Sequence, residues 1–457
     1  MKNFQSKNPA TGAEINSYEP HSSNEVRKRV ALADKAQKEW AGQTFERRGG
    51  IITSVAAELR RDKEELARVM VIEMGKPVTQ ARAEIEKCAA TCDYYAAETP
   101  KLLASENISS DAAKSFICFQ PIGVILGIMP WNFPFFQVFR AAVPALMAGN
   151  AFLLKHASNV TGCSLAIEEV FRRGGLPVGL FSALLIDGQR ARRLIANPVI
   201  RGVTLTGSTS AGRAVASAAG RAIKKTVLEL GGSDASVVLA DADLEMAAQI
   251  CAKARLINSG QSCIAAKRFI VERPVLDEFM QHFLKAMSKK MGDPLDDLTE
   301  IGPLARLDLR EELHGQVQRS VVAGARLVLG GQIDDAAPGA FYPPTILAGV
   351  KPGIAAFDEE TFGPAAAVIE AKDAEEAVEL ANRSSYGLGA SVFTRDLARG
   401  ERIAATQLQA GCCFVNDFVR SDPRFPFGGV KDSGYGRELS YFGLREFVNV
   451  KTVWVKG

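Results

Sequence analysis

The spacing of hydrophobic residues divides the chain into a helical first part and a part in which strands and helices alternate. Between about residues 26 and 99, hydrophobic residues recur at helical spacing with charged residues between them, as in NEVRKRVALADKAQKEW. This pattern predicts amphipathic helices. Further on, short hydrophobic runs such as GVILGIM, NAFLLKH, FSALLI and GVTLTG alternate with helical stretches such as FQVFRAAVPAL. Such alternation predicts a parallel sheet covered on both faces, which binds ligands at the carboxyl ends of its strands.

A second alternation of strands and helices follows the sequence TVLELGG. Its hydrophobic runs include DASVVLADAD, RFIVERP, ARLVLGG, PAAAVIEA and GASVFTRD. We therefore expect a second α/β domain from near residue 232. The C-terminal stretch REFVNVKTVWVKG favours a β-strand that pairs with another chain or with a sheet edge, which predicts an oligomer.

Composition narrows the class of protein. A chain of 457 residues with 47% hydrophobic content is long enough for two or three domains, each with a core. Because 55 Lys and Arg balance 52 Asp and Glu without long blocks of one charge, neither a nucleic-acid surface nor a membrane surface is predicted. The start of the chain lacks a signal-peptide core and no apolar run is long enough to span a membrane, so we expect a cytoplasmic protein that acts on a small molecule.

The eight cysteines do not form a disulfide or zinc pattern. Cys88 and Cys92 are one helical turn apart, but no second pair or histidine cluster completes a metal site, so no metal is expected. Cys412 and Cys413 are adjacent; two small residues at the end of a buried strand are favoured over a redox switch.

Three short motifs suggest a ligand site at strand ends. GSTSAGRA (207–214) fits a phosphate site at a helix start or a plain turn between strand and helix, while Arg213 and Ala214 exclude a nucleotide triphosphatase. Lys155, in LLKHAS, follows a strand where a ligand would lie, although such lysines are often solvated surface. Asn132 stands between two prolines in MPWNFPFF, which suits an oxyanion donor or a rigid aromatic turn.

Glu229 and Cys263 are the strongest candidates for chemistry. Glu229 lies in the apolar stretch LELGG, where burial raises a carboxylate pKa and suits a general base; capping or pairing with a lysine is the alternative. Cys263 lies among small and polar residues in SGQSCIA, which leave a thiolate accessible for attack on a carbonyl. The four histidines occur in no comparable stretch, so Glu229 is the better candidate base.

Six motifs in order, PWNFP, TGST, LELGG, SGQSCIA, EETFGP and PFGGVKDSGYGRE, resemble the NAD(P)-dependent aldehyde dehydrogenase superfamily over essentially the whole chain. The chain is particularly similar to the short bacterial and cyanobacterial succinate-semialdehyde dehydrogenases through KHAS and SCIAAKRF. The resemblance implies an α/β fold with a Rossmann-type cofactor domain at 1–106 and 124–231 and an α/β catalytic domain at 232–431. Segments 107–123 and 432–457 would form a small β element for assembly into a homodimer or homotetramer.

The resemblance also implies roles for individual residues. Cys263 would attack the aldehyde, the Asn132 amide and the Cys263 backbone N–H would hold the oxyanion, and Glu229 would activate the water that hydrolyses the thioester. The implied cofactor-binding residues are Trp131, Lys155, Ser158, Gly207, Ser208, Glu360 and Phe362. Ser158 replaces a glutamate that is common in NAD-preferring relatives and would repel a 2′-phosphate, so we predict NADP as cofactor, with NAD weaker.

The implied substrate-binding residues are Arg140, Ser421, Phe133 and Phe427. An arginine suits a substrate carboxylate, although Arg140 pairing with a structural acid is the alternative. Where some members carry a second arginine, this chain has Ile257, which reduces the positive charge of the pocket; Arg420 or Arg424 are possible substitutes.

The preferred hypothesis is therefore NADP-dependent oxidation of succinate semialdehyde to succinate. A dehydrogenase with broader specificity for ω-semialdehydes or medium-chain aldehydes is the alternative within the class. A cofactor-independent thiol esterase and a non-catalytic protein are alternatives from other classes.

Overall fold

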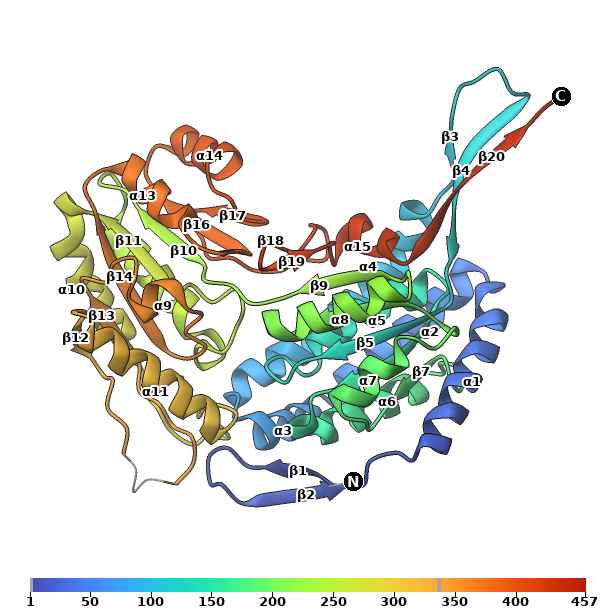
Figure 1. Ribbon diagram of the computed structural model, residues 1–457, viewed down its shortest axis with the longest axis horizontal. Coiled ribbons are helices and arrows are strands. Elements are labelled where there is room, and N and C mark those ends of the chain that lie inside the picture. Colours follow the sequence, from blue (N-terminus) through green and yellow to red (C-terminus); the bar gives the residue numbers. More distant parts are fainter. Residues whose placement is uncertain (1–2, 335–337) are drawn as a thin grey trace.

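Two sheets built mainly from parallel strands organise the chain, and they lie in separate lobes in Figure 1. The computed structural model describes residues 3–334 and 338–457, so positions 1–2 and 335–337 of the predicted domain ranges lie outside the described residues. No helix in the described part of the chain has the length and apolar composition needed to cross a membrane.

The first sheet has six strands in the order β19-β9-β8-β5-β6-β7. Its strands are β5 (Val124–Met129), β6 (Ala151–His156), β7 (Phe181–Ala183), β8 (Ile200–Thr206), β9 (Lys225–Glu229) and β19 (Gly434–Tyr435). The strands β5 to β9 run parallel, and only β19 is antiparallel to its neighbour β9. The connections contain α5 (Phe136–Met147), α6 (Thr161–Arg173), α7 (Gly188–Leu194) and α8 (Thr209–Arg221). The predicted parallel sheet with helical crossovers is confirmed.

The helical N-terminal part packs against this sheet. Its helices are α1 (Ser23–Ala41), α2 (Phe45–Arg61), α3 (Lys63–Met74) and α4 (Val78–Leu102). The hydroxyl oxygens of Ser22 and Thr44 accept hydrogen bonds from backbone N–H groups in the first turns of α1 and α2, which fixes where these helices begin. The hairpin formed by β1 (Phe4–Lys7) and β2 (Glu14–Tyr18), which precedes these helices, was not predicted.

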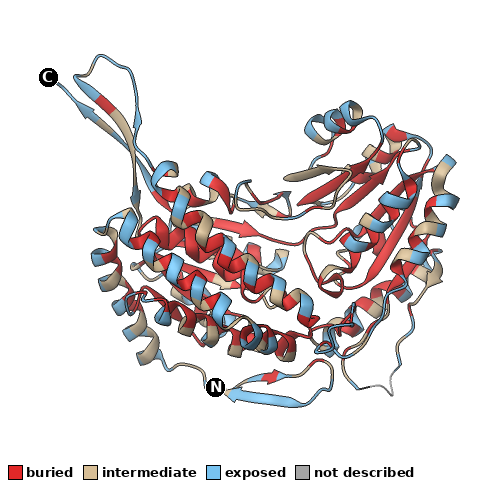
Figure 2. Cartoon of the chain, turned by 180° about the vertical axis from the view of Figure 1, so that it is seen from behind, coloured by how far each residue is buried: buried red, intermediate tan, exposed pale blue. Residues whose placement is uncertain are grey.

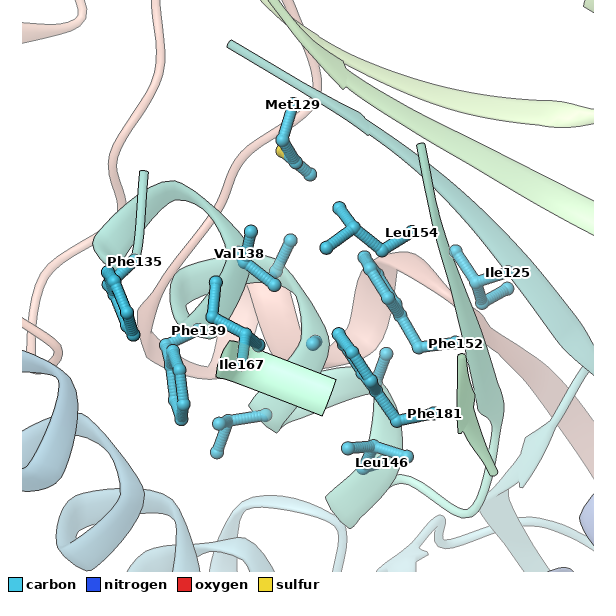
Figure 3. Close-up of a cluster of buried hydrophobic side chains, with 14 of the residues drawn as sticks. Ile125, Met129, Phe135, Val138, Phe139, Leu146, Phe152, Leu154, Ile167 and Phe181 are labelled. Carbon is cyan, nitrogen blue, oxygen red and sulfur yellow. The ribbon is translucent and has the colours of Figure 1, made fainter. Parts of the chain in front are cut away.

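Aromatic and aliphatic side chains fill the space between the first sheet and its helices. Figure 3 shows Phe152 of β6, Phe181 of β7 and Phe139 of α5 in one buried cluster, and the Phe152 and Phe181 rings stack with their centroids 6.0 Å apart. Gly127 of β5 faces this layer, and a Cβ there would lie 2.2 Å from the Phe152 ring. The sheet therefore supports α5, which carries the predicted site residue Arg140, on a tightly packed base.

The second sheet has seven strands in the order β12-β13-β14-β11-β10-β16-β17. Its strands are β10 (Ala235–Val238), β11 (Arg268–Glu272), β12 (Arg326–Leu329), β13 (Thr345–Ala348), β14 (Ala365–Ala371), β16 (Gly389–Phe393) and β17 (Cys412–Val415). Its helices are α9 (Leu244–Leu256), α10 (Leu276–Met287), α11 (Leu307–Val322), α12 (Ala355–Asp358), α13 (Ala374–Asn382) and α14 (Leu397–Thr406). Every hydrophobic run predicted in this region forms a strand, and Cys412 and Cys413 begin β17 with both residues half-buried.

A narrow antiparallel extension projects from the first lobe. It consists of β3 (Glu106–Asn107), β4 (Lys114–Pro121) and the C-terminal β20 (Val448–Val455), with β4 in the middle. Figure 2 shows that this extension is largely exposed, in contrast to the buried strands of the two main sheets. The predicted C-terminal strand is confirmed, while the predicted domain ranges and the assembly role of the extension stay predictions.

The remaining short elements connect the lobes and the loops. They are β15 (Tyr386–Gly387), which pairs with β18 (Val430–Lys431), the helix α15 (Ser440–Glu446), and the 3-10 turns η1 (Ser158–Val160), η2 (Ile257–Gly260) and η3 (Arg273–Val275).

Candidate active site

A cavity of about 880 Å³ brings together the predicted nucleophile and all four predicted substrate-binding residues. They are Cys263, Arg140, Ser421, Phe133 and Phe427. These residues come from the loop before β11, from α5 and the turn before it, and from the loop that follows β17. The cavity therefore joins segments from both lobes around one thiol.

The loop that carries Cys263 is held by buried cationic side chains. The Lys267 ammonium donates hydrogen bonds to the carbonyl oxygens of Ser262 (3.0 Å) and Cys263 (2.6 Å), and the Arg255 guanidinium donates to the Gly260 carbonyl at 2.6 Å. Bonds between charged donors and carbonyl groups are strong inside a protein. The hydrogen bonds from Lys267 and Arg255 hold the backbone of the loop in place and thereby position the Cys263 thiol.

The surroundings of Cys263 favour the neutral thiol. Burial raises the pKa of Cys263 to about 12, while the positive charges of Arg140 and Lys267 act in the opposite direction. The thiol is therefore protonated at neutral pH in this structure, and a base must remove its proton before it attacks a carbonyl.

Asn132 lies beside the same loop. Its side-chain nitrogen donates a hydrogen bond to the Gln261 carbonyl at 3.1 Å, and the Asn258 side chain donates to the Asn132 carbonyl at 2.7 Å. An amide nitrogen carries two hydrogens, so one remains available for a developing oxyanion. The geometry suits the predicted oxyanion donor, and that role stays a prediction.

Glu229 is the last residue of β9 and is completely enclosed. Burial raises the pKa of its carboxyl well above the usual range, and the negative charge of Glu438 adds to this effect. Neither carboxylate oxygen has a hydrogen-bond partner in the described part of the chain. A raised pKa makes the carboxylate form a stronger base than an ordinary carboxylate, and its oxygens lack hydrogen-bond partners among the described residues, which suits the predicted base.

Arg140 lines the cavity and also forms a buried ion pair with Glu438. Its guanidinium lies 4.6 Å from the centre of the Phe427 ring. Pairing with a structural acid was the alternative left open by the sequence, and the structure contains that pair. Contact of Arg140 with a substrate carboxylate stays a prediction.

Lys87 is a cavity residue that the sequence analysis did not single out. It lies on α4, its ammonium donates a hydrogen bond to the Ser421 hydroxyl at 2.6 Å, and its nitrogen is 4.2 Å from the centre of the Phe136 ring. The helical spacing could have indicated it, because Glu84, Cys88 and Thr91 on the same part of α4 are all buried. A lysine on the buried side of a helix suggests a functional or paired charge.

The carboxyl ends of β5, β6 and β8 carry the predicted cofactor residues. Lys155 is the penultimate residue of β6, not the residue after the strand, and burial lowers the pKa of its ammonium. Ser208 caps α8, and its hydroxyl oxygen accepts a hydrogen bond from the Ala211 N–H at 3.3 Å. Gly207 precedes this cap, while Ser158 is exposed at the start of η1. A half-buried cation and an exposed helix start on one sheet edge fit the ribose and phosphates of a dinucleotide.

Glu360 lies where the cofactor edge meets the nucleophile loop. Its carboxylate accepts a hydrogen bond from the Gly232 N–H at 3.0 Å and lies 3.5 Å from the Lys267 nitrogen. The Phe362 and Trp131 rings form an edge-to-face pair with centres 5.7 Å apart. The predicted residues Glu360, Phe362 and Trp131 are therefore placed together, and their contacts with a cofactor stay predictions.

The described residues contain no cluster of three or more His, Cys, Asp or Glu side chains that could hold a metal ion.

A parallel sheet with a dinucleotide edge and a thiol in the adjoining cavity defines the class of nicotinamide-dependent oxidoreductases that act through cysteine. A model described as "Aldehyde dehydrogenase family" matches residues 1–453, and the chain belongs to this family. It is 48% identical over 449 residues to a probable succinate-semialdehyde dehydrogenase [NADP(+)] of Synechocystis sp., covering 98% of each chain.

Two further relatives carry the same kind of name. The succinate semialdehyde dehydrogenase [NAD(P)+] Sad of Escherichia coli is 46% identical, with 98% of this chain and 96% of the relative covered. The crystal structure of succinic semialdehyde dehydrogenase from Streptococcus pyogenes in complex with NADP+ superposes with a TM-score of 0.97, at 35% identity, covering 99% of this chain and 100% of that chain. The predicted family and fold are confirmed.

Proposed function

We propose that this protein oxidises succinate semialdehyde to succinate with NADP as the oxidant. The observation that carries the proposal is that Cys263, Arg140 and Ser421 line the same cavity. Cationic and hydroxyl groups suit a carboxylate at the far end of an aldehyde substrate. The names of the relatives from Synechocystis sp. and Escherichia coli support the same substrate.

Covalent catalysis begins with the Cys263 sulfur. After the thiol has given its proton to a water molecule, the thiolate attacks the aldehyde carbon and forms the anion of a thiohemiacetal on the enzyme. The Asn132 amide and the Cys263 backbone N–H hold the negative oxygen of this intermediate. Loss of hydride from the same carbon leaves a thioester, and Glu229 takes a proton from the water that hydrolyses it and releases the acid.

The residues present on the sheet edge fit a dinucleotide. Lys155 and Ser158 would hold the adenosine ribose, Gly207 and Ser208 the pyrophosphate, and Glu360 the nicotinamide ribose. When bound, the cofactor supplies the acceptor for the hydride that leaves the substrate carbon. An exposed hydroxyl at position 158 leaves room for a 2′-phosphate and presents no charge against it, which supports NADP over NAD.

A broader specificity is the second candidate function. Ile257 lines the cavity together with Phe133 and Phe427, and Arg140 is already paired with Glu438. These apolar walls also suit an aldehyde without a carboxylate, such as a medium-chain aldehyde.

The same proposal includes assembly and location. The exposed extension of β3, β4 and β20 supports a homodimer or homotetramer. A cytoplasmic location fits the eight cysteines, which are all free thiols.

The proposal is tested by following the absorbance of reduced nicotinamide with succinate semialdehyde or butanal, each offered with NADP or NAD. We expect the highest kcat/KM for succinate semialdehyde with NADP. Cys263→Ala should lose activity by about 10⁴-fold or more because the nucleophile is gone. Glu229→Gln should form the acyl-enzyme but release it slowly, and mass spectrometry of the quenched reaction should show the succinyl adduct.

Equal kcat/KM values for butanal and succinate semialdehyde would support the broader dehydrogenase instead. Ester hydrolysis by the wild-type protein, together with no nicotinamide reduction from either aldehyde, would contradict the oxidoreductase proposal.

A further inference from the structure

The cation of Lys87 has no carboxylate partner within ion-pair distance among the described residues. Its polar contact is the hydrogen bond to the Ser421 hydroxyl, and its other close neighbour is the face of the Phe136 ring. A hydroxyl and an aromatic face orient an ammonium but leave its charge uncompensated. One of the three ammonium hydrogens thus remains for another acceptor.

The acids around Lys87 are already bound to other groups. The Glu84 carboxylate forms an ion pair with Lys76 and accepts hydrogen bonds from the backbone N–H groups of Phe135 (3.0 Å) and Phe136 (2.9 Å). These bonds hold the start of α5. The carboxylate of Glu84 is consequently engaged with groups other than Lys87.

The remaining neighbours show the same pattern. The Asp422 carboxylate forms bonds of 2.9 and 2.6 Å with Arg424, and Glu438 is paired with Arg140. The cavity therefore contains a lysine charge that no carboxylate of the described chain balances directly. Burying such a charge costs free energy unless a ligand of opposite charge compensates it.

We propose that Lys87 binds the distal carboxylate of the substrate, together with Ser421, and supplies the positive charge that Ile257 does not. This inference rests on the proposed function and narrows it to short ω-oxo carboxylates. Lys87 thereby acts as a specificity residue: it contacts the end of the substrate that does not react.

Lys87 and the thiol line the same cavity, with Arg140 near both. Lys87, Arg140 and Cys263 line one cavity, and the charge of Arg140 acts on both the Lys87 ammonium and the Cys263 thiol. Arg140 therefore lies near both ends of the site. A substrate whose aldehyde contacts Cys263 can extend past Arg140 and place its carboxylate at Lys87.

The experiment compares kcat/KM for succinate semialdehyde with kcat/KM for butanal, which has the same number of carbons but no carboxylate. We expect Lys87→Met to lower this ratio by roughly 10- to 100-fold, mainly by raising KM for the semialdehyde, because a half-buried, charge-assisted contact with the carboxylate is lost. Lys87→Arg should restore most of the ratio.

Lys253→Met is the matched control. Lys253 also lines the cavity, and its ammonium lies 4.9 Å from the centre of the Phe418 ring, but the residue is exposed to solvent. An exposed lysine contributes little to binding, so this variant should leave the ratio unchanged. Unchanged kcat/KM for butanal in Lys87→Met would show that the variant is folded.

The pH dependence of the same ratio tests the charge of Lys87 in the wild-type protein. Burial and the neighbouring Arg140 lower the pKa of Lys87 to about 8, while Cys88, Glu84 and Asp422 act in the opposite direction. The ammonium is charged below this pH and neutral above it. The ratio should therefore fall as the pH rises through about 8, and Lys87→Arg should remove this fall.

The outcomes separate this inference from the proposed function. If the wild-type protein does not prefer the semialdehyde over butanal, the proposed substrate is wrong. If it does prefer the semialdehyde, and the ratio is the same in Lys87→Met or does not change with pH, the role of Lys87 is wrong while the proposed function stands.

Discussion

Ser158 is the residue at which the proposed cofactor preference is most directly tested. It is an exposed hydroxyl three residues after Lys155, at the start of η1. We expect Ser158→Glu to lower kcat/KM for NADP relative to NAD by roughly 10- to 100-fold, because a carboxylate repels the 2′-phosphate and accepts hydrogen bonds from ribose hydroxyls. Steady-state kinetics with both cofactors measure the change.

Ser158→Ala is the control for that substitution, since it removes the hydroxyl without adding charge. It should weaken NADP binding only slightly, by a few-fold, as for one neutral hydrogen bond. A Ser158→Glu protein that keeps its NADP preference would show that other residues decide the cofactor.

At the residue scale, the sequence indicated candidate site residues but not the residues with which they form ion pairs and hydrogen bonds. Cys263 was singled out from its local motif, Arg140 and Ser421 were singled out from the family resemblance, and all three line one cavity. The pairing of Arg140 with Glu438 joins residues almost 300 positions apart, and no local pattern indicates it. Lys87 stands in no motif at all, because its importance arises from what α4 packs against rather than from its sequence neighbours.

At the element scale, the loop that carries the nucleophile depends on a glycine that no other residue can replace without strain. Gly260 has a φ of +78°, and a Cβ there would lie 2.3 Å from the backbone of Gly363. We expect Gly260→Ala to destabilise the protein by about 1–3 kcal/mol and to reduce activity, because the backbone must move away from Gly363. Urea unfolding and kcat measurements test both effects.

Gly220, near the end of α8, is the matched control for Gly260. A Cβ at Gly220 meets nothing within 4 Å, and its backbone is helical. Gly220→Ala should therefore stabilise the protein by about 0.4–1 kcal/mol. If both alanine variants unfold at the wild-type urea concentration, the strain assigned to Gly260 is absent.

Burial explains which strands could be predicted from the sequence and which could not. Most strands of the two main sheets are buried and read as hydrophobic runs, so they were recognised, whereas the short strands β13 and β19 were not. The hairpin of β1 and β2 is largely exposed and carries polar residues, so it lacks the hydrophobic pattern on which recognition depends. Its strands are recognised only from their pairing in the structure.

At the scale of the whole molecule, hydrophobic side chains of β20 are exposed to water in the single chain. Val450 is 59% exposed and Trp454 is 53% exposed, and their spacing puts both on one face of the strand. We expect Val450→Lys with Trp454→Lys to shift the protein to a smaller assembly, because charges oppose burial in an interface. Light scattering after size-exclusion chromatography measures the mass.

Lys451→Gln, on the other face of β20, should leave the assembly unchanged. An unchanged mass of the double variant would place the interface elsewhere on the molecule.

The last strand of the first sheet, β19, comes about 200 residues after its neighbour β9, which has a consequence for synthesis. In the pairing of β19 with β9, Gly434 lies opposite Glu229, and Glu438 pairs with Arg140. A nascent chain on the ribosome has already produced Glu229, Arg140 and Cys263 but still lacks these two partners. The site is therefore completed only after residues 434–438 have emerged, so chains that end before them carry the thiol without the finished pocket around it.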